Sequence, residues 1–146
     1  MYFAPFHPDH LLRLRLPDYQ DYIQQYLPND QWRRSYFHPG LSYSALDGEY
    51  VAACFGTVPL WPGRGFVWAM FDRKIGPARF AAVTQRCREE GERLLANGAF
   101  YRLEAYVQVG YTAAERWAEL LGMAREGRHI LLDGKRDFYA YARVKQ

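Results

Sequence analysis

Hydrophobic and polar positions follow short, changing periods in the first part of the chain. Residues 1–6 alternate loosely and are rich in aromatic side chains, which predicts a short first strand. Pro8 and Asp9 favour a helix start, and Asp18 can cap a second short helix with tyrosines at three- and four-residue spacing. Residues 27–40 then predict a loop or an irregular helix before the next strands.

The strongest strand pattern surrounds Asp47 and Gly48. These residues form a two-residue turn signal between two alternating runs, so we expect a β-hairpin there. The second strand is expected to stop at Pro59, because proline cannot donate a ladder hydrogen bond. A further turn at residues 62–65 and an apolar strand at residues 66–71 are expected to follow.

The pattern changes to a helical period in the second half of the chain. Over residues 77–97 apolar side chains recur at three- and four-residue spacing and charges mostly occupy the other face, which predicts a long amphipathic helix. Three elements are expected after it. They are a strand at 101–109, a helix that ends at Gly122, and a final hairpin that turns at Asp133-Gly134.

This order of elements favours one α/β domain over residues 1–146. Strand–helix–strand units in the second half imply some parallel pairing, while the hairpins imply antiparallel pairing elsewhere. A mixed sheet with helices on both faces follows. The length of 146 residues fits a single domain, and no linker, internal repeat or low-complexity segment divides the chain.

Composition narrows the classes of protein to which the chain can belong. Apolar residues make up 49% and charged residues 24%, which is typical of a globular chain rather than a disordered one. The net charge of +3 comes without a run of five like charges, so a nucleic-acid partner is not expected. No apolar run approaches the roughly 20 residues of a membrane span. Residues 1–10 lack signal-peptide features, and Cys54 and Cys87 lack metal-site spacing, so we expect a reduced cytoplasmic protein without a metal.

The segment "RKIGPA", residues 73–78, lies where the apolar strand meets the long helix. Gly76 allows close backbone approach or a positive φ, and proline at the first helical turn needs no partner for its nitrogen. The free N–H groups of a helix start, with Arg73, Lys74 and Arg79 beside them, can hold a phosphate or a pyrophosphate. The alternative is a plain strand-to-helix connection with solvated basic residues.

The chain resembles the GNAT superfamily of N-acetyltransferases. Residues 73–78 match that family's Arg/Gln-x-x-Gly-x-Gly/Ala signature, and the closing segment "WAELLGMAREGRHILLDGKRDFYAYARV" is similar to the family's end. The likeness covers nearly the whole chain and is most specific between Val67 and Val144. Within the family, it is closest to short GNAT-like proteins encoded by tailed bacteriophages.

The resemblance implies a mixed, mostly antiparallel sheet with a V-shaped splay between its two central strands, and acetyl-coenzyme A as co-substrate. It implies that the pantetheine arm pairs, like an added strand, with the backbone of Val67, Trp68 and Ala69. It assigns the pyrophosphate contacts to Arg73, Lys74, Ile75, Gly76, Ala78 and Arg79.

The sequence departs from the family pattern where proton transfer is concerned. Ala118 and Tyr111 stand at the positions of the family's Tyr and Asn, so the usual general acid is missing there. Glu104 and Tyr106 share one face of the neighbouring predicted strand and are the catalytic candidates. The alternatives are a solvated or Arg-paired sheet residue for Glu104 and core packing for Tyr106.

Two main functions remain open from the sequence. The first is transfer of an acetyl group from acetyl-coenzyme A to a primary amine, which can be a protein Lys, an N-terminus or a small amine. The aromatic-rich N-terminal half then shapes the acceptor side. The second is a phage protein of GNAT fold that binds and modulates a host protein in the host cytoplasm, with or without coenzyme A binding and without turnover. A virion structural component is neither supported nor excluded.

Overall fold

The computed structural model describes all 146 residues, and their contacts group into two compact units. The N-terminal unit comprises Met1–Val58 and Val67–Cys87, and the C-terminal unit comprises Pro59–Phe66 and Arg88–Gln146. The seven strands follow the order β1-β2-β3-β4-β5-β7-β6 in the sheet. The β4–β5 pair is parallel, and the pairs β1–β2, β2–β3, β5–β7 and β6–β7 are antiparallel. The predicted mixed, mostly antiparallel sheet is thereby confirmed.

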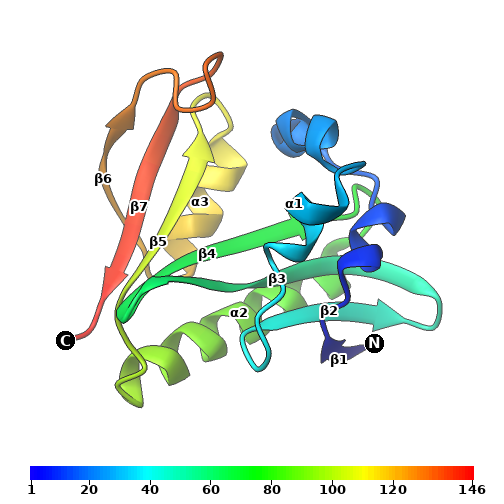
Figure 1. Ribbon diagram of the computed structural model, residues 1–146, viewed down its shortest axis with the longest axis horizontal. Coiled ribbons are helices and arrows are strands. Elements are labelled where there is room, and N and C mark those ends of the chain that lie inside the picture. The colour runs from blue at the N-terminus through cyan, green and yellow to red at the C-terminus, as the bar shows by residue number, and fades with distance from the viewer. The chain divides into compact units, whose positions relative to one another are not determined.

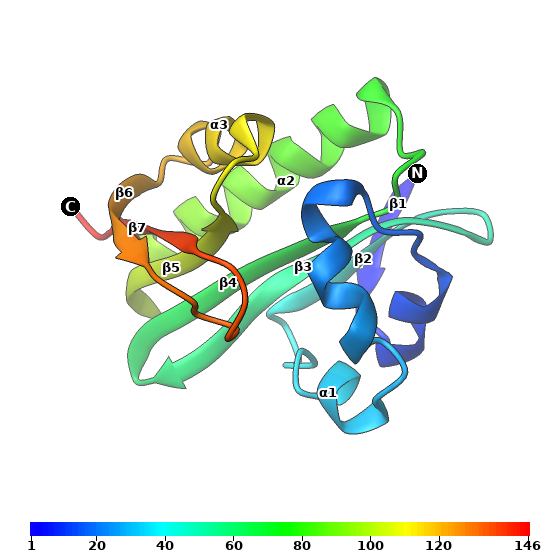
Figure 2. The same ribbon diagram turned by 90° about the horizontal axis from the view of Figure 1, so that it is seen from above.

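The N-terminal unit is built on a hairpin sheet. Its strands are β1 (Tyr2–Pro5), β2 (Ser42–Asp47), most of β3 (Tyr50–Trp61) and the end of β4 (Gly63–Phe71) (Figure 1). Its helices are η1 (Pro8–Arg13), η2 (Asp18–Tyr26), α1 (Asp30–Arg34) and the first half of α2 (Pro77–Ala96). Within this unit, the short helices lie on one side of the strands and α2 lies on the other (Figure 2). The central strand β3 is buried through Ala52, Ala53 and Cys54, which are all 0% exposed, because both of its faces are covered.

The C-terminal unit is a three-stranded antiparallel layer with one short helix. Its elements are β5 (Phe100–Gln108), α3 (Thr112–Leu120), β6 (Ala124–His129) and β7 (Phe138–Val144), together with the start of β4 and the end of α2. β7 lies between β5 and β6, as the red strand in Figure 1 shows, and α3 contacts β5. Its most buried large side chains, at no more than 3% exposed, are Leu94, Leu103, Phe138 and Tyr141.

Two sequence predictions about turns are wrong. β3 does not stop at Pro59 but continues to Trp61, and β4 begins already at Gly63. The register of β3 with β2 ends at Gly56, so at Pro59 the missing N–H breaks no pair with β2. The predicted turn at residues 62–65 is therefore much shorter than expected.

The final hairpin has its second strand where the sequence predicts it. β6 ends at His129 and β7 begins at Phe138, so the predicted turn at Asp133-Gly134 lies within an eight-residue connection. The Asp133 carboxylate accepts hydrogen bonds from the N–H groups of Lys135 and Arg136 inside this loop. Aspartate thus makes a local turn within a longer loop, rather than closing the hairpin.

None of the helices combines the length and the apolar character that crossing a bilayer requires.

Candidate functional site

The segment between β4 and α2 forms an open helix start in the N-terminal unit. β4 ends at Phe71, α2 begins at Pro77, and Gly76 has a φ of +79°. The first helical hydrogen bond runs from Phe80 N–H to Gly76 C=O, at 3.0 Å. The backbone N–H groups of Gly76, Ala78 and Arg79 make no hydrogen bond within the protein. Three donors at a positive helix end are thus open to an anion.

The buried side chain of Asp72 holds this turn in place. Its carboxylate is almost completely buried and accepts hydrogen bonds from Tyr50 Oη at 2.8 Å, Arg15 N at 2.9 Å and Lys74 N at 3.1 Å. Burial alone would raise the pKa of Asp72, but these hydrogen bonds outweigh burial and lower the pKa below the ordinary value. Asp72 therefore shapes the turn as a carboxylate and is not free to act as a base.

The basic side chains of the turn differ in their availability. Arg73 and Lys74 are exposed and have no hydrogen bond or ion pair from their side chains. Arg79 forms an ion pair with Asp47 at 2.8 Å, and its guanidinium lies 4.9 Å from the centre of the Tyr50 ring. Two of the three predicted cations are thus available to a ligand, and the third braces the turn.

Ile75 differs from the other predicted contacts of this turn. Its side chain is 9% exposed, and its N–H donates to Asp72 C=O at 3.0 Å. Because its only backbone donor is already used, Ile75 can support the turn but cannot give an N–H group to a phosphate.

The predicted pairing strip, Val67, Trp68 and Ala69, lies on β4 beyond its register with β5. That register ends at Phe66, opposite Glu104. Asp72 N–H donates to Ala52 C=O of β3, so the alternate residues Ala69 and Phe71 direct their backbone groups to the other edge.

Part of that edge is already occupied by a side chain. Gln20 of η2 donates from Nε2 to Ala69 C=O at 2.6 Å, and Phe71 N–H donates to Gln20 Oε1 at 3.0 Å. Gln20 is only 8% exposed. Nothing in the sequence singles out this residue, because it lies 49 and 51 positions from its two partners.

Trp68 points its side chain into an aromatic cluster of the N-terminal unit. Its ring lies 5.3 Å from Phe6 and 4.7 Å from Tyr36, edge to face in both cases. Burial, with the nearby Tyr22 and Tyr26, raises the pKa of Tyr36 well above its ordinary range. Trp68 Nε1 is buried and has no hydrogen-bond partner. A buried indole N–H without a partner is uncommon and marks a position where a ligand acceptor atom or a water fits.

Glu104, in the C-terminal unit, is held between two guanidinium groups. Arg64 contacts it at 2.5 Å and 2.7 Å, and Arg102 contacts it at 2.6 Å. The hydrogen bond from Arg64 is the main cause that lowers the pKa of Glu104, with Arg102 adding to it. A buried carboxylate with a lowered pKa is a weak base, so the geometry favours the Arg-paired interpretation over a catalytic one.

Tyr106 is the more available of the two catalytic candidates. Its ring lies 6.1 Å from Phe66 and 5.3 Å from His129, and it is half-buried. Its hydroxyl makes no hydrogen bond within the protein. Ala118, at the position of the usual general acid, is 3% exposed and faces the interior of the unit. Tyr111 takes the N-cap position of α3 without a side-chain cap.

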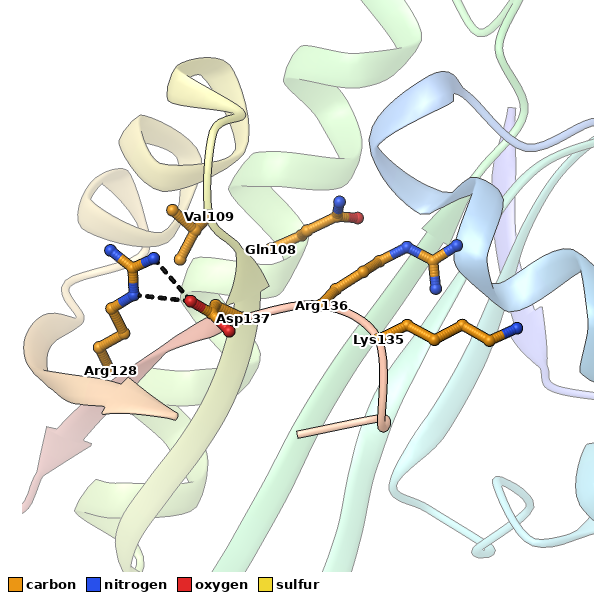
Figure 3. A pocket seen from close by; sticks show the side chains of 6 residues that line it. All are labelled: Gln108, Val109, Arg128, Lys135, Arg136 and Asp137. Carbon is orange, nitrogen blue, oxygen red and sulfur yellow. Dashed lines mark hydrogen bonds and ion pairs between the residues drawn. The ribbon is translucent and has the colours of Figure 1, made fainter. Parts of the chain in front are cut away.

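A cationic recess that the sequence did not indicate lies at the end of β5 and the β6–β7 loop. Its volume is about 350 Å³, and it is lined by Gln108, Val109, Arg128, Lys135, Arg136 and Asp137 (Figure 3). Arg128 donates to Asp137 at 2.6 Å and 3.1 Å, which neutralises the one carboxylate of the recess. Lys135 has no side-chain partner, so the recess can receive an anionic group.

No group of three or more His, Cys, Asp or Glu side chains lies close enough together to hold a metal ion.

Comparison with known proteins agrees with this architecture. In sequence, the chain matches no protein-family model and no curated protein. In structure, it is similar to a GNAT-family acetyltransferase from Bacillus anthracis, with a TM-score of 0.70, 15% identity and coverage of 98% of this chain and 93% of that one. It is similar to the ribosomal-protein-S18-alanine N-acetyltransferase from Escherichia coli, with a TM-score of 0.70, 16% identity and coverage of 99% and 94%.

A third similar structure contains coenzyme A. It is a ribosomal L7/L12 alpha-N-protein acetyltransferase in complex with coenzyme A, with a TM-score of 0.69, 14% identity and coverage of 97% and 92%. At these identities the likeness establishes the fold. The chain therefore has the fold of the GNAT acetyltransferases.

Proposed function

We propose that the protein is an acyl-coenzyme A-dependent N-acetyltransferase, which moves an acetyl group from acetyl-coenzyme A to a primary amine. The observation that carries the proposal is the open helix start at Gly76. It presents three unpartnered N–H groups and two unpaired cations, in a chain with the fold of N-acetyltransferases. Free N–H groups at the positive end of a helix, with two unpaired cations beside them, suit the binding of a phosphate group.

The residues of the turn fit a pyrophosphate. The N–H groups of Gly76, Ala78 and Arg79 would donate hydrogen bonds to its oxygens, and Arg73 and Lys74 would neutralise its charge. Pro77 contributes no N–H, so the set has one donor fewer than the same turn with another residue there. Bound acetyl-coenzyme A supplies a thioester whose acyl carbon is open to attack by a neutral amine.

Proton transfer falls to Tyr106 in this proposal. Of the two catalytic candidates, Tyr106 has a free hydroxyl that can donate a proton, whereas Glu104 is engaged by Arg64 and Arg102. The amine must lose a proton before it attacks, and we assign no residue of this chain to that step.

The acceptor side belongs to the aromatic region of the N-terminal unit. Tyr26 stacks on Trp32, Trp32 contacts Tyr36, and Tyr36 contacts Trp68, with ring-centre distances between 4.7 Å and 5.5 Å. Aromatic faces attract alkylammonium groups. The acceptor can be a protein Lys, an N-terminus or a small amine. Two of the similar structures are ribosomal-protein N-acetyltransferases, and another structure of the same fold is a spermidine N-acetyltransferase. The two free cysteines suit a reducing cytoplasm.

The test is ligand-induced stabilisation followed by turnover. At a hundredfold excess over Kd, acetyl-coenzyme A should add about 2.7 kcal/mol to the free energy of unfolding, or on the order of 5–10 °C in Tm. Replacing Arg73 and Lys74 together by Ala should abolish most of that shift. The matched control is Arg88→Ala, since Arg88 is an exposed and unpaired arginine farther along α2. Release of free thiol in the presence of candidate amines then measures transfer.

A second candidate function is a phage-encoded protein of the same fold that binds a host protein without turnover. Two observations favour it: the ion-paired state of Glu104, and an exposed apolar run on the β6–β7 loop. Ile130, Leu131 and Leu132 are 75%, 55% and 46% exposed. Coenzyme A binding without thiol release from any amine, together with loss of partner capture in Leu131→Ser, would favour this function over the first.

A further inference from the structure

The side-chain amide of Gln20 occupies the edge of β4 as a neighbouring strand would. It accepts from one backbone N–H, of Phe71, and donates to one backbone C=O, of Ala69, on the same edge. Gln20 is fixed for this task, since it is 8% exposed and its own N–H donates to Pro17 C=O at 2.9 Å. An amide that makes both bonds reproduces the pattern of a paired strand.

The two groups that Gln20 binds are the ones nearest to the open helix start. β4 ends at Phe71, and the turn with the free donors follows directly. A ligand whose phosphates lie in that turn, and whose extended arm runs back along the β4 edge, meets Phe71 N–H and Ala69 C=O first. Beyond them, alternation leaves only Val67 C=O and Ala69 N–H on that edge before the register with β5 begins at Phe66.

We infer that Gln20 is an internal competitor for the cofactor arm, which an amide-bearing ligand must displace from Ala69 and Phe71 to bind along β4. The inference rests on the proposed function, because it assumes that the phosphates lie in the turn at Gly76. The exchange is close to balanced, since the arm makes the two neutral hydrogen bonds that Gln20 gives up. Gln20 thereby keeps the edge paired while the site is empty and lowers the apparent affinity for the arm.

Two probes separate the arm from the phosphates. Coenzyme A carries both parts, whereas 3′-phosphoadenosine 5′-diphosphate carries the phosphates without the amide arm. Calorimetric titration of the full chain with each probe compares the wild type with Gln20→Ala. We expect Gln20→Ala to bind coenzyme A about three- to tenfold more tightly, because removing a competing pair of hydrogen bonds frees the edge. The affinity for the nucleotide should stay within twofold.

Matched variants guard against a general loss of structure. Gln20→Met keeps the volume of the side chain but lacks the amide, and it should also tighten coenzyme A binding. Gln24→Ala changes an exposed glutamine of the same helix and should change neither affinity. In the wild type, the side-chain amide resonance of Gln20 should move when coenzyme A saturates the protein and stay in place with the nucleotide.

The outcomes also distinguish the inference from the proposed function. If coenzyme A binds and shifts the backbone amides of Gly76 and Ala78, but Gln20 stays in place and its variants bind no more tightly, only the inference is overturned. If neither probe binds, the proposed function fails and the inference fails with it. Tighter coenzyme A binding by both Gln20 variants, with unchanged nucleotide affinity, supports both.

Discussion

At the scale of single residues, buried polar side chains decide what the candidate site can do. Asp72 fixes the turn through Tyr50, Arg15 and Lys74, and Gln20 occupies the strand edge beside it. Residue type and position predict a phosphate turn, and that assignment stays a prediction. The contacts of Asp72 with Arg15 and of Gln20 with β4 could not be predicted, because hydrogen bonds between residues about 50 positions apart leave no periodic trace in a sequence.

Replacing Asp72 by Asn should loosen the turn. Asparagine can keep only part of the acceptor set, so at least one buried donor loses its partner, at a cost of about 1–3 kcal/mol in the free energy of unfolding. Tyr50→Phe removes a single donor and should cost less, about 0.5–1.5 kcal/mol. Urea unfolding measures both. Equal stability of Asp72→Asn and the wild type would show that Asp72 does not hold the turn.

Replacing Tyr106 by Phe should lower kcat without raising the KM for acetyl-coenzyme A. A positioned acid typically contributes 10²–10⁴-fold to the rate, and the ring contacts with Phe66 and His129 persist in the variant. Tyr101→Phe, on the same strand, removes only the hydrogen bond from Trp61 and serves as the control. An unchanged kcat in Tyr106→Phe would exclude Tyr106 as the acid.

At the scale of elements, most helices and strands follow from local pattern. The Asp47-Gly48 turn, the start of α2 at Pro77 and the strand β5 all lie within a few residues of their predicted places. The errors concern Pro59 and the turn at residues 62–65, where β3 continues past the end of its register with β2. Where a strand ends depends on how far its partner strand extends beside it. The residue pattern of one segment does not contain that information.

Replacing Gly56 by Ala tests how closely β2 and β3 approach each other. A Cβ at this position would lie 2.5 Å from Leu41 O and 2.8 Å from Ser42 Cα, and both are backbone atoms that cannot move aside. Gly56→Ala should therefore cost about 1–3 kcal/mol in the free energy of unfolding. Gly127→Ala on β6 meets no atom within 4 Å and should cost nothing. Equal effects of the two changes on the urea midpoint would refute the close approach.

At the scale of the whole molecule, ion pairs tie stability to pH. Glu104 lies between Arg64 and Arg102, and Arg102 also pairs with Glu126. The hydrogen bond from Arg102 lowers the pKa of Glu126, as the bond from Arg64 lowers that of Glu104. The general fold was predictable from the order of elements and the family resemblance, whereas these pairings depend on which strands become neighbours.

Stability should therefore fall in acid. A carboxylate whose pKa is lowered by folding stabilises the protein above its unfolded pKa of about 4, and this contribution is lost as pH falls through the folded pKa. We expect the free energy of unfolding to be level between pH 6 and 8 and to decrease from about pH 5 towards pH 2. Urea unfolding at each pH measures this free energy. In the Glu104→Gln variant it should fall less steeply as the pH is lowered. Stability that rises on acidification would contradict the assigned ion pairs.

The sequence by itself determined the periods of the strands and helices, the position of the open helix start and the cations beside it. These features depend on residues that are neighbours along the chain, so local physical chemistry is sufficient to predict them. Only the tertiary structure decided that Gln20 covers the β4 edge, that Asp72 is committed to the turn, and that Glu104 is paired with arginine. Each of these depends on two segments meeting after the chain folds, and hydrogen bonds at about 3 Å act only once that has happened.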